Sequence, residues 1–506
     1  MDGKVYLVGG GPGDLELLTR KAYRLICEAD CLIYDRLIDP KILEETKPTC
    51  EHIYVGKENR NHSMRQEEIN QLLVDKASVY PLVVRLKGGD VYVFGRGGEE
   101  ALFLREHQVP FEVVPGITSA IAGLAYAGIP ITHRGIAGGF HVVTAHNKLD
   151  ELAEIDFCAM AKSEDTAVFL MGLTKLPEIV SHLMEAGKSG DTQIAVISHA
   201  TLPTQEVLTS TLSRVVEDFR RQPLSSPALI VIGGVVGLRE KLNFFEEKRL
   251  FGTRILLPRV GNQASVLAEQ LTRLGANVCE VQTGFLKENQ DALDSLDYRN
   301  YTHIVLTSKN AVQYFMNSLH KNKVDLRMLH GIRFAVIGSA TRAYLEEFGI
   351  YADLMPETYH RDALWKLLEE HLKPTDHVLF PKGKALNEEG QELEDKLREI
   401  CPTDVVILYE NEPMEQAEPT EYSDLKNHSA LTETQFDLAV FTCSSCVRRS
   451  VEAIKESQNR TQIKYISIGE KTSETLRKHG IHSVIQAKQA TFESLLDTIL
   501  EQADNQ

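Results

Sequence analysis

The sequence predicts an α/β protein built on parallel sheets, and two observations carry this prediction. In the first 120 residues, apolar segments at 4–8, 82–86 and 111–114 each run directly into a glycine-bearing loop. In the second half, a set of strand–loop–helix motifs occurs twice, offset by about 130 residues. Strands that alternate with helices favour parallel sheets, and loops after such strands are where open α/β sheets bind ligands.

Length and composition further restrict the kinds of protein that this chain can be. The 506 residues correspond to three or four folding units at roughly 150 residues each. The net charge of −17 disfavours a non-specific nucleic-acid binder, although a local basic pocket for a small anion remains compatible with it. No apolar run approaches the roughly 18 residues that span a bilayer. Eight scattered cysteines and a start unlike a signal peptide predict a cytoplasmic protein without nucleic-acid or membrane partners.

The first glycine loop, GGGPGD at 9–14, lies where a dinucleotide-binding fingerprint would lie. Gly9 and Gly11 fit that fingerprint, but Asp14 occupies the third glycine position. A carboxylate there would repel a pyrophosphate, and Pro12 lacks one of the amide donors that would hold it. The loop therefore favours a tight turn capped by Asp14, followed by a helical pattern from Leu15 to Ile26.

The second glycine loop combines flexibility with charge. RLKGGD at 85–90 is followed by FGRGGEE at 94–100. Glycines allow close approach of a ligand to the backbone, and Asp90 can accept hydrogen bonds from a cationic or hydroxyl-rich ligand. Such a loop could hold an adenosine with an amino-acid tail, but by itself it is equally compatible with a structural turn.

The expected domain boundaries follow changes in the pattern. Strand candidates at 142–144, 167–171, 194–198 and 227–234 predict a second lobe after residue 132. The first domain is expected over 1–245, with lobes of about 1–132 and 133–245, and a short linker leads to the second domain at 252–506.

The second domain should consist of two similar lobes around a shared cleft. HIVLTS at 303–308 matches LAVFTC at 438–443, and FAVIG at 334–338 matches YISIG at 465–469. One lobe is expected at about 252–285 plus 412–506, and the other at about 286–411. The pair Cys443 and Cys446 is a weak zinc or redox signal without a second pair or a nearby histidine, so a structural role is favoured and no metal is expected.

A series of N-terminal motifs carries a specific resemblance. They are VYLVGGGPGD (5–14), YDRL (34–37), VGK (55–57), RLKGGD (85–90), FGRGGEE (94–100), VVPGITSA (113–120), AYAGIP (125–130), THR (132–134) and PAL (227–229). With these motifs, residues 3–245 resemble the uroporphyrinogen-III C-methyltransferases. Val91 and the Ala145-His146 pair depart from that pattern without removing a charged or catalytic group.

This resemblance implies a two-lobed tetrapyrrole methyltransferase fold, S-adenosylmethionine as methyl donor and a homodimer through this half. The implied cofactor contacts are Pro12, Gly88, Gly89, Asp90, Val93, Thr118, Ser119, Met171 and Ala200. Asp35 would be the proton acceptor and Lys57 the proton donor. The alternatives are core packing for Met171, a turn cap or an Arg36 ion pair for Asp35, and a solvated loop position for Lys57. Lys57 and Arg134 are also candidates for binding substrate carboxylates.

The C-terminal half, over about 252–500, resembles the uroporphyrinogen-III synthases through weaker motifs. These are LPR (257–259), LGA (274–276), LTSKNAV (306–312), VIG (336–338), Tyr409, FT (441–442) and IG (468–469) with Thr472. The resemblance makes Tyr409 the candidate general acid, with packing at a hinge as the alternative. Candidate carboxylate partners are the loops at Gly338 and Gly469 and the side chains of Lys309, Arg342, Lys382, Arg448 and Lys471.

Together the two resemblances imply a bifunctional enzyme of tetrapyrrole biosynthesis. It would cyclise hydroxymethylbilane to uroporphyrinogen III and methylate that product twice to precorrin-2, a precursor of sirohaem and cobalamin. A methyltransferase for a later corrinoid intermediate is a competing interpretation, which the YDRL motif at 34–37 argues against. In a further alternative, the C-terminal half is a non-catalytic tetrapyrrole-binding module.

Overall fold

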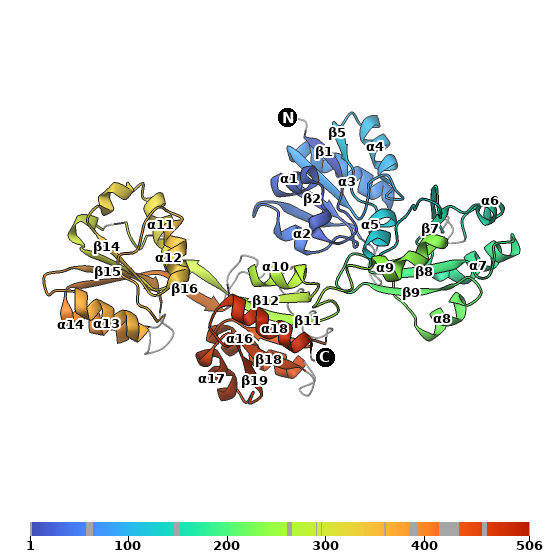
Figure 1. Cartoon of the computed structure of the whole chain (residues 1–506). Helices are drawn as coiled ribbons and strands as arrows, with labels where there is room; N and C mark the ends of the chain where they lie inside the picture. The colour runs from blue at the N-terminus through green and yellow to red at the C-terminus, as the bar shows by residue number, and fades with distance from the viewer. Residues whose placement is uncertain are drawn as a thin grey trace. The chain divides into compact units, whose positions relative to one another are not determined.

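The structure is a computed structural model of the whole chain. It describes residues 3–56, 64–145, 152–260, 266–289, 291–294, 296–358, 361–384, 392–413, 435–457 and 463–504. The chain forms two compact units, shown in Figure 1: an N-terminal unit of 1–253, 270–277 and 503–506, and a C-terminal unit of 254–269 and 278–502. Among the described residues, no helix is long and apolar enough to cross a membrane.

The first sheet of the N-terminal unit is parallel throughout, in the order β3-β2-β4-β1-β5. Its strands are β1 (Lys4–Gly9), β2 (Cys31–Tyr34), β3 (Glu51–Tyr54), β4 (Leu82–Lys87) and β5 (Phe111–Val114). The central strands are almost fully buried, which explains their continuous apolar runs. Because the strands are parallel, the loops after β1, β2, β4 and β5 all leave from one edge of the sheet.

The helices of this lobe are α1 (Arg20–Glu28), α2 (Lys41–Glu44), α3 (Gln66–Val79), α4 (Gly97–Glu106) and α5 (Ser119–Tyr126). The helix expected from Leu15 begins only at Arg20, after a short 3-10 turn at Leu15–Leu17. Two caps explain the difference. Asp14 accepts a hydrogen bond from the Glu16 amide, and Thr19 accepts one from the Ala22 amide, so the chain restarts its helical winding at Thr19.

The second sheet of the N-terminal unit is mixed, in the order β6-β7-β10-β8-β9. Its strands are β6 (Phe140–Thr144), β7 (Thr166–Leu170), β8 (Gln193–Ser198), β9 (Glu206–Thr211) and β10 (Ala228–Ile232). Only β6 and β7 pair in parallel; the other neighbours are antiparallel. The surrounding helices are α6 (Phe157–Lys162), α7 (Leu176–Glu185), α8 (Val215–Arg221) and α9 (Arg239–Leu242).

The C-terminal unit contains one long sheet of two parallel halves. Its order is β14-β13-β15-β16-β12-β11-β17-β18-β19. The strands are β11 (Arg254–Val260), β12 (Asn277–Glu288), β13 (His303–Leu306), β14 (Arg333–Val336), β15 (Val378–Gly383), β16 (Thr403–Pro413), β17 (Leu438–Phe441), β18 (Lys464–Ser467) and β19 (Val484–Gln486). The long strands β12 and β16 join the halves as an antiparallel pair, with Leu286 opposite Asn411.

The internal repeat of the sequence reappears as repeated structure. Helix α11 (Lys309–Lys321) follows β13 as α16 (Ser444–Ser457) follows β17, and α12 (Ser339–Glu346) follows β14 as α17 (Glu470–Lys478) follows β18. Helices α11 and α12 lie on one face of the first half, and α13 (Arg361–His371) and α14 (Glu392–Ile400) on the other (Figure 1). Helices α10 (Val266–Arg273) and α18 (Phe492–Ala503) complete the described α-helices. The predicted α/β class is confirmed.

Candidate functional site

The glycine loops after β1 and β4 are joined directly to each other. The Gly11 amide donates to the Gly89 carbonyl over 3.2 Å, and the Gly89 amide donates to the Gly11 carbonyl over 2.6 Å. Both residues have positive φ, +74° and +68°, a conformation that favours glycine. The two glycine signals seen separately in the sequence therefore form one structure at the edge of the first sheet.

The loop after β5 packs against these two glycine loops so closely that no side chain would fit between them. A Cβ on Gly116, which follows β5, would lie 2.2 Å from the Gly89 carbonyl oxygen. A Cβ on Gly9 would lie 2.5 Å from the Gly116 nitrogen. The glycines therefore allow the ends of β1, β4 and β5 to approach at backbone distance.

Asp90 organises these loops through its side chain. One carboxylate oxygen accepts from the Tyr92 and Val93 amides, over 2.8 and 3.1 Å, and the other accepts from the Gly116 amide over 3.0 Å. Asp90 therefore connects the β4 loop to the β5 loop. Asp90 would therefore influence ligand binding first by fixing the shape of both loops.

The remaining predicted cofactor residues lie on neighbouring segments. Pro12 lies in the β1 loop, Gly88 lies beside Leu37, and Thr118 and Ser119 stand at the start of α5, where the Thr118 hydroxyl accepts from the Ala120 amide. Ala200 follows β8 and packs on α5: a Cβ on Gly123 would lie 3.0 Å from that of Ala200.

Met171 stands immediately after β7, with half of its surface exposed and a φ of +56°. His199 and Thr201, which flank Ala200, also have positive φ. Such strained non-glycine residues cluster at binding sites in many proteins. Local sequence patterns do not reveal them.

Asp14 joins the β1 loop to Tyr126 in α5 and to Thr201 in the second lobe. The Tyr126 hydroxyl donates to Asp14 over 2.8 Å, and the Asp14 amide donates to the Thr201 hydroxyl over 3.3 Å. Burial, followed by the hydrogen bond with Asp14, raises the pKa of Tyr126, so the hydroxyl remains a donor. The sequence analysis missed Tyr126 as a site-shaping residue, although it lies in the AYAGIP motif.

Asp35 follows β2 and pairs with Arg85, which lies on the adjacent strand β4. The distance from its carboxylate to Nη2 of Arg85 is 3.4 Å, and its other oxygen accepts from the Leu37 amide over 3.3 Å. Asp35 therefore does cap a turn, but its ion-pair partner is Arg85 rather than the considered Arg36.

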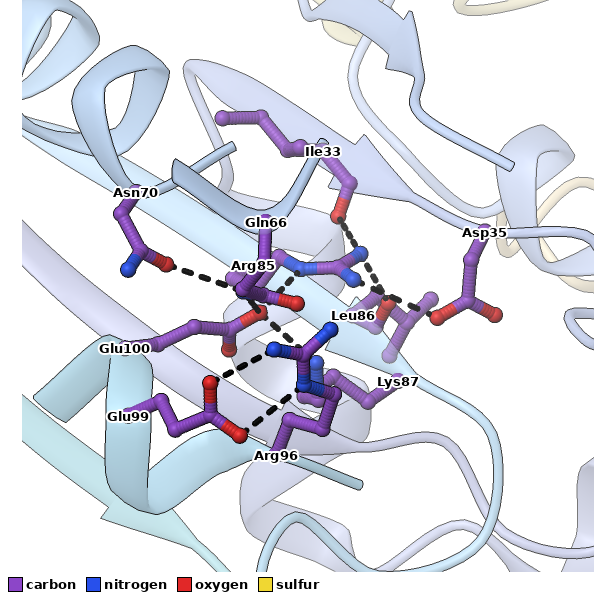
Figure 2. A network of polar contacts seen from close by, with 10 residues as sticks. All are labelled: Ile33, Asp35, Gln66, Asn70, Arg85, Leu86, Lys87, Arg96, Glu99 and Glu100. Carbon is purple, nitrogen blue, oxygen red and sulfur yellow. Dashed lines mark hydrogen bonds and ion pairs between the residues drawn. The ribbon is translucent and has the colours of Figure 1, made fainter. Parts of the chain in front are cut away.

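Arg85 belongs to a buried charge cluster with Lys87 and Glu100, shown in Figure 2. Their exposed fractions are only 3%, 4% and 0%. One oxygen of Glu100 accepts from Arg85 Nε over 3.3 Å, from Lys87 Nζ over 2.8 Å and from Gln66 over 3.2 Å. Burial, followed by the nearby charge of Arg85, lowers the pKa of Lys87.

Lys57 and Arg134 are the other two predicted residues. Lys57 lies outside the described residues. Arg134 is exposed in the turn between the lobes. Among the residues that the structure describes, no group of three or more His, Cys, Asp or Glu side chains is placed to hold a metal ion.

The C-terminal unit has a cavity of about 660 Å³ that both halves of its sheet line. Residues of the first half include Ser308 and Lys382, and residues of the second include Arg259, Cys443 and Arg448. The connecting strands contribute Leu286, Tyr409 and Asn411.

Tyr409 lies in this cavity. Its hydroxyl is 3.3 Å from the Ser308 hydroxyl, and its ring centroid is 4.9 Å from that of Tyr314. A Cβ on Gly383 would lie 2.5 Å from the Tyr409 ring, so this glycine makes room for the ring. Burial raises the pKa of Tyr409, which keeps the phenol protonated and able to donate a proton.

Cationic side chains line the same cavity, and they only partly coincide with those that the sequence analysis proposed. Of the predicted carboxylate partners, Lys382 and Arg448 line it. Lys309, Arg342 and Lys471 are not among its described lining residues, and Arg342 pairs with Glu346 over 2.8 Å. The sequence analysis did not assign Arg259, Arg361 or Lys384, which do line the cavity. Their separation along the chain explains why local motifs did not identify them.

Comparison with known proteins matches a different family to each half of the chain. The family model of the tetrapyrrole (corrin/porphyrin) methylases matches residues 4–216, and that of uroporphyrinogen-III synthase HemD matches residues 265–497. The porphyrin biosynthesis protein HemD of Ruminiclostridium josui is 34% identical over 503 residues, 99% of this chain and 98% of the relative. The chain belongs to the tetrapyrrole methylase family and, in its second half, to the uroporphyrinogen-III synthase family. It is therefore an enzyme of tetrapyrrole biosynthesis.

Other relatives share mainly the methylase half. The uroporphyrinogen-III C-methyltransferase of Bacillus subtilis is 39% identical over 71% of this chain and 75% of the relative. That of Methanocaldococcus jannaschii is 48% identical over 47% of this chain and 98% of the relative. A crystal structure of the Thermus thermophilus uroporphyrin-III C-methyltransferase with S-adenosylhomocysteine is 44% identical, covering 47% of this chain and all of that chain, with a TM-score of 0.41.

Proposed function

We propose that this fused enzyme cyclises hydroxymethylbilane to uroporphyrinogen III in residues 252–506 and methylates it twice in residues 1–245, giving precorrin-2. The observation that carries the proposal is the presence of both families in one chain, which a relative matches over nearly its whole length. The methyltransferase relatives support the second reaction. The first reaction rests on the synthase family and on the cationic cavity.

The glycine loops of the methylase half fit S-adenosylmethionine as methyl donor. The backbone at Gly88 and Gly89 carries no side chains that would exclude an adenosine, and Asp90 holds these loops in place. When bound, this donor supplies a methyl group already activated by a sulfonium. Positioning and proton removal are then the tasks left to the protein.

Asp35 is the proposed proton acceptor of the methylation. A pyrrole carbon that takes a methyl group leaves the ring positively charged, and loss of a proton restores its neutrality. An ionised carboxylate can accept that proton because it has only acceptor oxygens. Arg85 restricts the orientation of Asp35, and the buried Glu100 in turn holds Arg85.

Tyr409 is the proposed general acid of the cyclisation. Hydroxymethylbilane must lose its terminal hydroxyl as water, and the Tyr409 phenol can donate the required proton. The linear tetrapyrrole must also be held in a folded pose, which is mainly an entropic problem. Arg259, Arg361, Lys382, Lys384 and Arg448 are the proposed partners for its carboxylates.

The decisive test is to incubate the full-length protein with hydroxymethylbilane and labelled S-adenosylmethionine. The expected product is precorrin-2 carrying two labelled methyl groups. Supplying uroporphyrinogen III directly separates the two reactions. Methylation of supplied uroporphyrinogen III, together with only unrearranged tetrapyrrole from hydroxymethylbilane, would instead identify the C-terminal half as a non-catalytic binding module.

Two further expectations accompany the proposal. Turnover of a later corrinoid in preference to uroporphyrinogen III would overturn the assigned methylation substrate. A homodimer through the methylase half is proposed from the family resemblance, and light scattering of the full-length protein would test it.

A further inference from the structure

Cys443 and Cys446 form a close dithiol in the cavity of the C-terminal unit. Their sulfur atoms lie 3.2 Å apart, and both residues line the cavity. Cys443 is half-buried and directly precedes α16, whereas Cys446 lies in the first turn with 1% of its surface exposed. All eight cysteines of the chain lie within the described residues, and none forms a disulfide.

The internal repeat shows what is unusual about this position. In the other half of the sheet, Ser308 precedes α11, and its hydroxyl accepts from the Ala311 amide over 3.0 Å. Cys443 occupies the matching place before α16, and the Cys446 amide bonds to its sulfur in the same way. A serine would suffice for capping. The second half of the cavity therefore carries a thiol pair that helix formation does not require.

The surroundings of Cys443 favour its thiolate. The hydrogen bond with the Cys446 thiol lowers the pKa of Cys443 against the opposing effect of burial, and hydrogen bonds with the Ser445 hydroxyl and two backbone amides lower it further. The same pairing raises the pKa of Cys446. The pairing therefore favours a thiolate on Cys443 with a protonated thiol on Cys446 beside it.

We propose that Cys443 and Cys446 are a redox-active dithiol that undergoes exchange with low-molecular-weight disulfides. Cys443 reaches the cavity as the attacking thiolate. Cys446 is positioned behind it as the resolving thiol. Residues three apart in a first helical turn can form a disulfide with an S–S length of about 2.05 Å by side-chain rotation. The strands that line the cavity need not move apart.

The exchange balances with glutathione disulfide as the oxidant. The Cys443 thiolate attacks one sulfur of the disulfide, forms a mixed disulfide and releases one glutathione thiolate. Cys446 then loses its proton to solvent, attacks the Cys443 sulfur and releases the second glutathione. The dithiol is oxidised by two electrons, and one glutathione disulfide is reduced to two glutathione molecules. The stabilised thiolate favours the reduced form, so a dithiol reductant should reverse the reaction readily.

Oxidation also changes the charge of the cavity. The reduced form places a negative thiolate among the cations of the lining, which include Arg259 and Arg448, and the disulfide carries no charge. A polycarboxylate should therefore bind the oxidised form more tightly. This consequence rests on the proposed synthase function, whereas formation of the disulfide does not.

The test uses the full-length protein, reduced, desalted and incubated with glutathione disulfide. Free thiols are then alkylated, and peptides are mapped by mass spectrometry without reduction. We expect an internal Cys443–Cys446 disulfide that dithiothreitol removes. Cys158, which is exposed, serves as the internal control and should carry glutathione as a mixed disulfide. In Cys446→Ala, which lacks the resolving thiol, glutathione should remain trapped on Cys443.

The following outcomes test the redox pair, the charge effect and the proposed synthase function separately. Cys443 and Cys446 that both remain open to alkylation after oxidation, or a stable glutathione adduct on Cys443 of the unaltered protein, would overturn the redox pair. For the charge effect, KM for hydroxymethylbilane should be several-fold lower after oxidation, and the ratio of oxidised to reduced KM should approach one in Cys443→Ser, which has no thiolate charge to lose. An unchanged KM in fully oxidised protein would overturn that effect. Loss of cyclisation in both redox states, with the disulfide still formed, would instead contradict the proposed synthase function.

Discussion

Asp35 and Arg85 lie 3.4 Å apart although 50 residues separate them in the chain. The sheet register explains the pairing: Arg85 on β4 lies opposite Ile33 on β2, and Asp35 continues β2 on the same face. Arg85 also contacts Glu100, so the partly exposed Asp35 is connected to a buried cluster. This relationship links the chemistry of the methylase half to the stability of its first sheet.

Replacing Asp35 by asparagine should lower methylation of uroporphyrinogen III by at least about 10²-fold, the lower range of general-base contributions. The fold, binding of the methyl donor and cyclisation should persist, because the amide keeps one acceptor oxygen for either Arg85 or the Leu37 amide. Asp39→Asn is the matched control, since Asp39 caps the next turn by accepting from the Lys41 amide. Near-normal methyl transfer in Asp35→Asn would show that Asp35 only caps its turn.

Replacing Glu100 by glutamine should lower the free energy of unfolding by about 3–5 kcal/mol, because two buried cations lose their anion. Glu99→Gln is the control: Glu99 forms an exposed ion pair with Arg96 and should contribute at most about 1 kcal/mol. Denaturant titration of both variants measures the difference. Equal stability of the two variants would contradict the role assigned to the buried cluster.

The stability loss in Glu100→Gln should also depend on pH. Removing Glu100 removes an interaction that raises the pKa of Lys87, so this pKa falls further below its usual value near 10.5. Between the lowered value and 10.5, the unfolded chain binds more protons than the folded protein, and stability therefore rises with pH. The deficit should be smaller at alkaline pH than at neutral pH, whereas the Glu99→Gln control should show no such trend.

Replacing Asp90 by alanine leaves the Tyr92, Val93 and Gly116 amides without their acceptor. We expect binding of S-adenosylmethionine to weaken by about tenfold or more and stability to fall by about 1–3 kcal/mol. Asp90→Asn, which retains one acceptor oxygen, should be intermediate. Calorimetry with S-adenosylmethionine and, separately, NAD is the measurement. Unchanged affinity would contradict the loop assignment, and NAD binding would favour the dinucleotide interpretation instead.

Replacing Tyr409 by phenylalanine should lower cyclisation by at least about 10²-fold while methylation of supplied uroporphyrinogen III persists. The phenylalanine ring keeps the packing on Gly383 and loses only the hydroxyl. Tyr314→Phe removes the hydroxyl of the neighbouring ring and is the matched control. A large surviving activity in Tyr409→Phe would support the alternative in which Tyr409 is a packing residue.

The lowered pKa of Cys443 predicts that its alkylation rate rises with pH below the ordinary thiol range and then levels off, since only the thiolate reacts. Cys446→Ala removes the thiol that stabilises this thiolate, so the midpoint should move to higher pH. Cys446→Ser retains a hydroxyl donor and should move it less. Peptide-resolved alkylation with iodoacetamide measures all three profiles. A midpoint in the ordinary thiol range in the unaltered protein would contradict the stabilised thiolate.

The sequence by itself determined the fold class and the repeat. Apolar segments that end in glycine loops depend only on the order of neighbouring residues. The same is true of matched motifs such as those at Gly338 and Gly469. Both can therefore be recognised from the sequence alone. Local order also placed Asp14 before a helical segment, where its side chain accepts a hydrogen bond from the Glu16 amide. The sequence pattern misplaced the start of α1. Two side chains that can cap a helix lie five residues apart there, and each favours a different start.

Only the tertiary structure decided which charges and thiols meet. The RLKGGD motif at 85–90 was considered as a ligand loop, yet its Arg85 is buried between Asp35 and Glu100. Strand order and register set such contacts, and they depend on packing across the whole sheet. The Cys443–Cys446 pair was visible in the sequence as a weak signal. Its sulfur separation and its place in the cavity follow from the start of α16 and the junction of the two sheet halves, which no local pattern encodes.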